Sequence, residues 1–304
     1  MENKFFKLVS VGSRSKEKGE RFARKFNCRA TSYDGVISDD LVDAVYVSLP
    51  SGLHYEWGLN VVNSGSHLLL EKPFADTFER AAEIIDTARK KNVVAMETLT
   101  YVYHPLFAEV SRLLKNGEIG TVRHVEASFG FPFLASSDIR NDRSLGGGAI
   151  LDNLVYPLSF CLNLIDGEYH SRSFHIIQDK ERGIDSRGFL RIDWHGVSAD
   201  ITYGFGFSYR NSFTVWGDKG ILHVDRAFTR PKEMAGEIAI QKEGGEKKTV
   251  SIEPANQFNL LLKAFYEKII GRDATGINEG EDILKRMKII SEMYRSSLSV
   301  QGGS

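Results

Sequence analysis

The sequence is poor in cysteine, carries almost no net charge and has no long apolar run, and each scarcity excludes a class of protein. Two cysteines in 304 residues, Cys28 and Cys161, make no CxxC-type spacing, so we expect neither a disulfide framework nor a metal site. A net charge of −1 gives no basic surface for nucleic acid or an anionic membrane. No apolar run approaches the ~20 residues of a membrane-spanning helix. We therefore expect a cytoplasmic protein.

The first part of the chain alternates short β-rich runs with amphipathic helical patterns. Strands are predicted at 6–12, 43–50, 67–70 and 93–98, and helices at 15–26, 54–65 and 77–92. The run at 43–50 is almost continuously apolar, which is typical of a parallel strand buried on both faces. This alternation predicts a doubly wound parallel sheet in a first domain, residues 1–120.

Beyond residue 120 the pattern changes to strands of alternating hydrophobicity, separated by turns such as Gly217–Gly220 and Glu243–Glu246. Two helical patterns, 257–270 and 281–298, follow these strands. The predicted fold class is therefore an α/β unit followed by an α+β unit, residues 121–304, with a large, mostly antiparallel open sheet.

Polar residues follow each predicted strand of the first domain, at the edge where open parallel sheets bind ligands. In "HLLLEKPFAD" (His67–Asp76), Glu71 and Lys72 end an apolar strand, and Pro73 restricts the backbone of the residue before it. An ammonium fixed there can orient a carbonyl oxygen and stabilise charge that develops on it during hydride addition. The alternative is an ordinary solvated strand exit.

A second informative stretch is "LGGGAILDNLVYPLSF" (Leu145–Phe160). Its three glycines allow close approach of the backbone to a ligand or a strand, just before an amphipathic helix. Asp152 and Tyr156 are four residues apart, which predicts that they share one face of that helix. A tyrosine whose pKa is lowered by a nearby ammonium can act as a general acid. The alternative is a helix with one capping acid and one half-buried tyrosine.

Five stretches together carry a resemblance to a known family. They are "HLLLEKPFA", "METLTYVYHP", "FGFP" (Phe129–Pro132), "LGGGAILDNLVYPL" and "YRNSFTVWGDKGILHVDRAFTRP". In this order they resemble the glucose–fructose oxidoreductase / inositol dehydrogenase (Gfo/Idh/MocA) family, and within it the branch of NADP-dependent sugar-nucleotide 3-ketoreductases and dihydrodiol dehydrogenases. The similarity covers nearly the whole chain.

The resemblance implies a Rossmann domain, a second domain on a large mixed sheet, and an active site between them. Lys72 would lie beside the nicotinamide and the substrate carbonyl, Tyr156 would be the proton donor, and Asp152 would orient the substrate or Lys72. Ser13 and Arg14 match the place where NADP-preferring members bind the 2′-phosphate, so NAD is the less expected cofactor. The other residues implied to line the cofactor are Leu49, Pro50, Ser51, His54, Glu71 and Glu97. Those implied to face the sugar are Tyr209, Arg210, Asn211 and Gln257.

One part of the family pattern is missing. A Rossmann unit opens with a strand, a G-x-G-x-x-G loop and a helix that binds the pyrophosphate. This chain opens instead on "ENKFFKLVSVGSRS", which matches the second strand of that pattern. Either the sequence is a truncated reductase, or it is a natural relative that has lost dinucleotide binding. We expect the chain as written to bind NADP weakly.

The leading interpretation is an NADP-dependent oxidoreductase that reduces a keto-sugar, most simply a nucleotide-linked one, and that assembles as a homo-oligomer through its C-terminal sheet. Two alternatives stay open. The first is oxidation of a cyclic trans-diol or a free sugar. The second is a non-catalytic sugar-binding or regulatory relative. The presence of the missing strand and glycine loop upstream of Met1 in genomic DNA would favour the enzyme.

Overall fold

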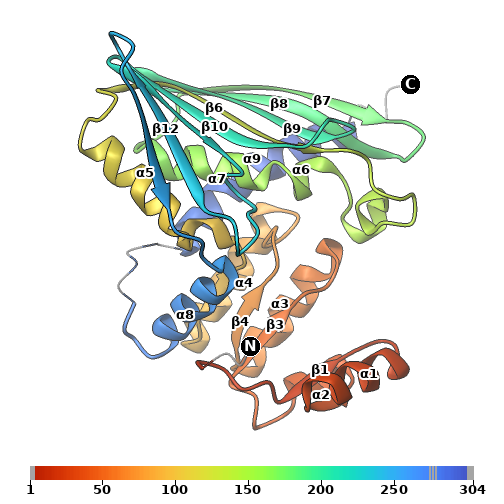
Figure 1. Ribbon diagram of the computed structural model, residues 1–304. Coiled ribbons are helices and arrows are strands. Elements are labelled where there is room, and N and C mark those ends of the chain that lie inside the picture. The colour runs from red at the N-terminus through yellow and green to blue at the C-terminus, as the bar shows by residue number, and fades with distance from the viewer. Residues whose placement is uncertain (1–3, 274, 276, 278, 300–304) are drawn as a thin grey trace.

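Short parallel strands form the first part of the computed structural model, which describes residues 4–273, 275, 277 and 279–299 (Figure 1). One sheet consists of β3 (Ala44–Val47), β4 (His67–Leu70) and β5 (Ala95–Glu97) in that order. β4 is buried, as its apolar run predicts. β3 is not buried on both faces as we expected, because Tyr46 is 45% exposed. The ring of Tyr46 meets that of Phe258 edge-on, and its hydroxyl donates to Glu71.

The helices of this part are α1 (Lys16–Phe26), α2 (Tyr33–Ile37), α3 (His54–Ser64) and α4 (Phe78–Lys91). Their ends follow from local sequence. Ser15 and Thr77 cap α1 and α4 by accepting backbone N–H groups with their side chains. Gly65 ends α3 with a φ of 89°, a conformation that glycine adopts without steric cost. The three helices predicted from the pattern are thus confirmed, and the short α2 was missed.

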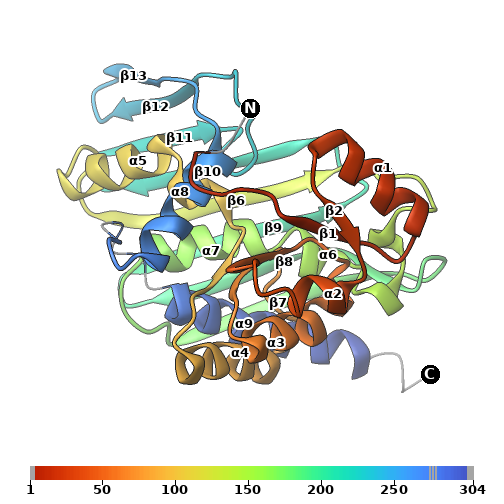
Figure 2. The same ribbon diagram turned by 90° about the horizontal axis from the view of Figure 1, so that it is seen from below.

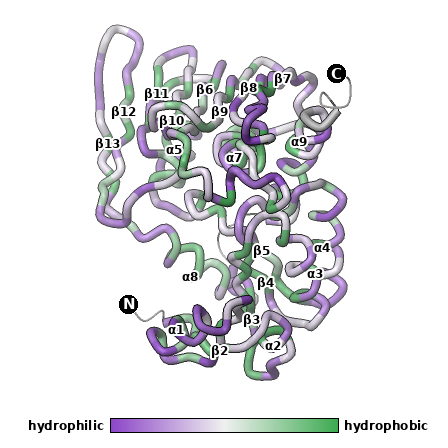
Figure 3. The backbone as a smooth tube through the Cα atoms, turned by 90° about the vertical axis from the view of Figure 1, so that its right-hand side faces the viewer, coloured by the Kyte–Doolittle hydropathy of each residue, from purple (hydrophilic) through white to green (hydrophobic). Residues whose placement is uncertain are grey.

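The parallel strands form two separate sheets. β1 (Ser10–Gly12) pairs only with β2 (Arg29–Thr31), and no strand among the described residues joins β1 to β3. Both β1 and β3 therefore have one unpaired edge within the described chain. The α1–β1–β2 unit is thinly packed: α1 buries only Gly19 and Ala23, and it lies at the lower end of the molecule, where the chain is mostly hydrophilic (Figure 3).

The second half of the chain is built on one eight-stranded sheet. Its order is β13-β12-β11-β10-β6-β9-β8-β7. The strands are β6 (Val122–Phe131), β7 (Ser171–Asp179), β8 (Ile184–Trp194), β9 (Val197–Phe205), β10 (Arg210–Gly217), β11 (Gly220–Asp225), β12 (Gly236–Lys242) and β13 (Lys247–Ile252). All neighbours are antiparallel except β6 and β9. This confirms the predicted large, mostly antiparallel sheet.

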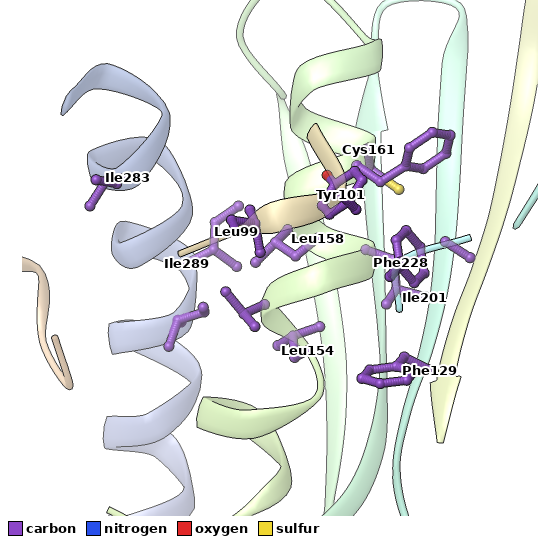
Figure 4. Packing of buried hydrophobic residues seen from close by; sticks show 14 of the residues in the cluster. Leu99, Tyr101, Phe129, Leu154, Leu158, Cys161, Ile201, Phe228, Ile283 and Ile289 are labelled. Carbon is purple, nitrogen blue, oxygen red and sulfur yellow. The ribbon is translucent and has the colours of Figure 1, made fainter. Parts of the chain in front are cut away.

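Helices cover one face of the large sheet. They are α5 (Pro105–Lys115), α6 (Ala149–Asp152), α7 (Val155–Leu164) and α9 (Glu279–Ser299) (Figure 1). Figure 4 shows α7 between α9 and the sheet, with Leu154, Leu158, Ile201 and Phe228 packed together. No single helix of the described residues is long and apolar enough to span a membrane. The bent pair Arg143–Asp152 and Val155–Leu164 has that composition because its apolar side chains form this core.

The stretch that carries Asp152 and Tyr156 is not one continuous helix, contrary to the prediction. α6 ends at Asp152, α7 begins at Val155, and the two segments are bent by 43°. Pro157 has no N–H to donate to the carbonyl of Asn153, so a continuous helix would leave that bond unmade. The side chain of Asn153 instead donates to the carbonyls of Phe129 and Gly204 on the sheet.

The predicted C-terminal helices, α8 (Gln257–Ile269) and α9, return to the first part of the chain. α9 packs against α7 under the large sheet and also against α4 and β5, and Figure 2 shows α3, α4 and α9 side by side. Arg286 of α9 is buried and pairs with buried Glu97 at the end of β5. The predicted domain boundary at residue 120 stays a prediction, since α9 belongs to the core of both parts.

Candidate functional site

Lys72 lies between the two halves of the molecule, two residues after the end of β4, at a cis peptide bond to Pro73. Its Nζ donates to Oδ1 of Asp152 at 2.5 Å and to the backbone carbonyl of Asp152 at 3.0 Å. The two side chains are 13% and 15% exposed. This charge-assisted contact joins the end of a parallel strand to the end of α6, and it fixes the ammonium in one place.

Both members of this pair stay charged at neutral pH. Burial by itself would lower the pKa of Lys72, but Asp152 and Tyr156 outweigh burial and raise it above 10.5. Burial would raise the pKa of Asp152, but the cations Lys72 and Arg140 outweigh burial and hold it below 3.8. Lys72 is therefore a hydrogen-bond donor with a permanent charge.

Tyr156 lies next to this ammonium, with the Lys72 Nζ 5.3 Å from its ring centroid. The rings of Phe129 and Phe228 contact it with centroid distances of 5.0 Å and 6.2 Å and form an apolar floor. Burial raises the pKa of Tyr156, and the lowering by Lys72 is smaller. Our expectation of a lowered pKa is therefore wrong, because desolvation dominates here. A half-buried phenol of this kind holds its proton until a stronger base forms beside it.

Arg140 is a site residue that the sequence did not predict. Its Nε donates to Oδ2 of Asp152 at 2.8 Å, so that one carboxylate holds two cations. The same guanidinium contacts Asp138 at 3.2 Å. The sequence shows only two arginines, Arg140 and Arg143, in a polar loop before the three glycines, and it does not tell which of them meets Asp152.

Glu71, His54 and Glu97 support the turn that carries Lys72 rather than facing open space. Glu71 accepts the Tyr46 hydroxyl at 2.5 Å and contacts Lys72 only through the backbone N–H, at 3.3 Å. His54 is 1% exposed, and its two ring nitrogens lie 2.7 Å and 2.8 Å from the carbonyl oxygens of Pro73 and Leu49. Glu97 accepts the N–H of Phe74 at 2.7 Å.

The residues predicted to bind the cofactor lie at the ends of β1 and β3. Arg14 is exposed, follows Ser13 directly, and forms no ion pair within the described chain. An exposed guanidinium beside a hydroxyl suits a phosphate group. Leu49, Pro50 and Ser51 form the turn after β3, and this turn packs on the glycine loop: a Cβ on Gly146 would lie 2.6 Å from the backbone nitrogen of Gly52. These residues fit a dinucleotide, whereas a pyrophosphate-binding glycine loop is not found among them.

The residues predicted to face the sugar divide into two pairs. Asn211 and Gln257 are buried and bond inside the protein, to Thr229 and Thr100 respectively. Tyr209 and Arg210 are exposed. Arg226, which the prediction did not include, stacks over the Tyr209 ring at 4.1 Å and has a φ of 49°, in the left-handed region that arginine rarely adopts.

Comparison with known proteins gives matches over most of the chain. The profile described as an oxidoreductase family with an NAD-binding Rossmann fold matches residues 1–99, and the profile of the GFO/IDH/MocA C-terminal domain matches residues 107–223. A dTDP-3,4-didehydro-2,6-dideoxy-alpha-D-glucose 3-reductase of Saccharopolyspora spinosa is 34% identical over 93% of this chain and 87% of its own length. A trans-1,2-dihydrobenzene-1,2-diol dehydrogenase of Xenopus tropicalis is 28% identical over 79% of this chain and 72% of its own length.

A solved structure gives the same picture. A 3-ketoreductase from Actinomadura kijaniata, in complex with NADP and TDP-benzene, superposes with a TM-score of 0.87 at 26% identity, over 96% of this chain and 89% of that chain. Structures of this ketoreductase also exist for variants at one tyrosine and at one lysine.

Replacing Asp152 by Asn should leave Lys72 and Arg140 as two partly buried cations without their shared anion. We expect a loss of about 3 kcal/mol in the free energy of unfolding at pH 7, measured by urea denaturation. The lowered pKa of Asp152 stabilises the fold above pH 3.8, and this contribution is lost as the pH falls through its folded value. The raised pKa of Lys72 stabilises it below pH 10.5, and this contribution is lost in alkali.

Asp138→Asn is the matched control, because Asp138 contacts Arg140 but not Lys72. We expect it to cost about 1 kcal/mol or less. Equal losses of unfolding free energy in the two variants would contradict this description of the ion cluster. So would a difference between the two losses that does not become smaller in strong acid and in strong alkali.

Proposed function

Because the chain belongs to the GFO/IDH/MocA oxidoreductase family, we propose that it is an NADP-dependent reductase of a nucleotide-linked keto-sugar. One observation carries the proposal: an ammonium, clamped by Asp152, lies beside the half-buried phenol of Tyr156. Together they give a carbonyl oxygen a fixed positive charge and a proton donor. The predicted cytoplasmic location stays a prediction.

Each residue has a separate task in this reaction. Bound NADPH supplies the hydride. Lys72 donates a hydrogen bond to the carbonyl oxygen and stabilises the charge that develops on it. Tyr156 then passes its proton to that oxygen, and the Lys72 ammonium stabilises the phenolate left behind. Asp152 and Arg140 keep Lys72 in place.

The relatives support the assignment of Lys72 and Tyr156. In the Actinomadura kijaniata ketoreductase, the tyrosine and the lysine chosen for substitution are separated by the same number of residues as Tyr156 and Lys72 in this chain. Several curated relatives are reductases of dTDP-linked keto-sugars. The diol dehydrogenase and a D-xylose dehydrogenase among the relatives keep oxidation of a diol or a free sugar as the second candidate.

The cofactor is held at the ends of the parallel strands. Ser13 and Arg14 bind the 2′-phosphate of NADP, and the turn at Leu49–Ser51 lies along the dinucleotide. His54, Glu71 and Glu97 contribute indirectly, since their side chains hold this turn and the Lys72 turn in position. How tightly NADP binds in the absence of a G-x-G-x-x-G loop stays a prediction.

Tyr156→Phe should remove the proton donor and leave the binding surface almost unchanged. We expect the rate of NADPH oxidation with a dTDP-linked keto-sugar to fall by about 10²-fold or more, with an unchanged dissociation constant for NADPH. Tyr55→Phe is the control, because that hydroxyl bonds to Glu83 on the surface. The proposed function fails if the wild-type chain oxidises NADPH with none of a panel of nucleotide-linked keto-sugars.

The stacked pair of Arg226 and Tyr209 gives the substrate side a free positive charge. No carboxylate within the described chain pairs with Arg226, and Asn211 holds its loop by accepting the N–H of Phe228 at 2.8 Å. Phe228 in turn contacts Tyr156, so this loop continues directly from the apolar floor of the site. We assign Arg226 to the diphosphate of the nucleotide.

Arg226→Gln is therefore expected to weaken the binding of dTDP, measured by calorimetry, by about tenfold. The salt dependence of the affinity should fall at the same time, because one charge contact is lost. Arg123→Gln removes the same charge where it pairs with Asp218, away from the site, and should change neither quantity. Equal affinities of the two variants for dTDP would overturn the assignment of Arg226.

The open face of the large sheet is where we expect two copies to pair. On the face opposite the helices, Phe189, Trp216 and Ile221 are 52%, 45% and 36% exposed. Large exposed apolar side chains on one sheet face favour association. Light scattering should give the mass of more than one copy, and Trp216→Lys should lower it, whereas Leu41→Lys, at an exposed site elsewhere, should not. A monomeric wild type would contradict this inference.

A further inference from the structure

Asp185 of β8 is a buried carboxylate that has no role in the reaction described above. It is 4% exposed. Its Oδ1 accepts the backbone N–H of Ile150, in the first turn of α6, at 2.6 Å. A Cβ on Gly148 would lie 2.3 Å from its Oδ2, and Gly148 has a φ of 118°. Only glycine allows the backbone to pass so close to this carboxylate.

The loop that Asp185 holds contacts both the turn assigned to the cofactor and the residues that hold Lys72. Gly146 packs on the turn of Ser51, which we assign to the cofactor. The N–H of Gly148 donates to the carbonyl of Arg140 at 3.1 Å, and the N–H of Asp152 donates to the carbonyl of Gly148 at 3.2 Å. A shift of this loop would therefore move both side chains that determine the position of Lys72.

We infer that Asp185 is a positioning residue for the reaction: its carboxylate fastens the start of α6, and thereby keeps Asp152 and Arg140 in contact with Lys72. This inference rests on the proposed function for its catalytic meaning. The contact itself is independent of that function.

Ionisation of Asp185 has a cost in stability. Burial raises its pKa to about 7, although the N–H groups of Ile150 and Ala149 and the guanidinium of Arg143 act in the opposite direction. The other titratable groups that face it are Tyr203 of β9 and Tyr294 of α9, and the pKa of each is raised, chiefly by burial. Because the folded pKa lies above 3.8, the contribution of this group to stability is complete in acid and is lost as the pH rises through about 7.

If Asp185 only filled space in the core, an uncharged residue at this position would make the protein more stable. Asn is nearly isosteric with Asp and escapes the cost of burying a charge. Its oxygen can still accept the N–H of Ile150, but its amide nitrogen cannot accept the N–H of Ala149. A core role therefore predicts that Asp185→Asn leaves the protein at least as stable at pH 8 and just as active. A positioning role predicts the same stability together with a disturbed loop.

The test compares wild type, Asp185→Asn and the control Asp193→Asn, which alters a half-exposed carboxylate on the same strand. The first readout is amide hydrogen exchange of the peptide covering residues 146–154, at pH 8. We expect exchange in this segment to become about tenfold or more faster in Asp185→Asn only. The second readout is kcat with NADPH and a dTDP-linked keto-sugar, which should fall by about 10²-fold in this variant at pH 8.

The two variants should also differ in their pH profiles. The ratio of the wild-type kcat to that of Asp185→Asn should shrink as the pH falls below about 7, because the wild-type carboxyl becomes neutral there too. Unchanged exchange at 146–154, or unchanged kcat and pH profile in a folded variant, would overturn the inference. If the wild type reduces no keto-sugar, the proposed function fails, while the exchange readout still decides whether Asp185 positions the loop.

Discussion

The contact between Lys72 and Asp152 is the constraint on which the rest of the site depends. It joins the end of a parallel strand to the end of a helix under the large sheet, and thus connects the two halves of the molecule at one charged point. Isolated, either charge would be costly to bury. Lys72 and Asp152 remain ionised because they pair with each other and because Asp152 also binds Arg140. The pKa of Lys72 is raised and that of Asp152 is lowered. The phenol of Tyr156 can serve as a proton donor because this ammonium would stabilise the phenolate. In an apolar pocket alone, the tyrosine would keep its proton.

Hydrogen bonds and packing on both sides of this contact hold Lys72 and Asp152 in position. On the side of the parallel strands, His54 contacts the carbonyls of Leu49 and Pro73, and α9 reaches the same turn through Arg286 and Glu97. On the side of the large sheet, the glycine loop is held by Asp185. The two sides meet where Gly146 packs against Gly52. Several residues that a family resemblance assigns to the cofactor, such as His54 and Glu97, thus act as supports for the backbone, whereas Arg14, Tyr209 and Arg226 are exposed and Tyr156 is half-buried.

Local signals in the sequence predicted four strands and three helices of the first half, although the first strand is shorter than predicted, and β2 and α2 were missed. Ser15, Thr77 and Gly65 act through neighbouring residues, so their effect could be read without the fold. The break between Asp152 and Val155 was missed, although Pro157 was a visible cause of it. The roles of Arg140, Asp185 and Arg226 could not be predicted, because each depends on a partner that only the tertiary structure brings near. The raised pKa of Tyr156 was missed for the same reason, since the spacing of residues does not show how deeply a side chain is buried.

Deuterium transfer is the first measurement to make on the proposed reaction, in which a hydride from NADPH reaches the carbonyl carbon of a keto-sugar beside Lys72 and Tyr156. The wild-type chain would be incubated with NADPH deuterated at the transferable position and a dTDP-linked 3-keto-sugar, and the product analysed by mass spectrometry and NMR. We expect one deuterium on the carbon that carried the carbonyl. A product without deuterium at that carbon, or binding of both ligands with no reduction, would contradict it.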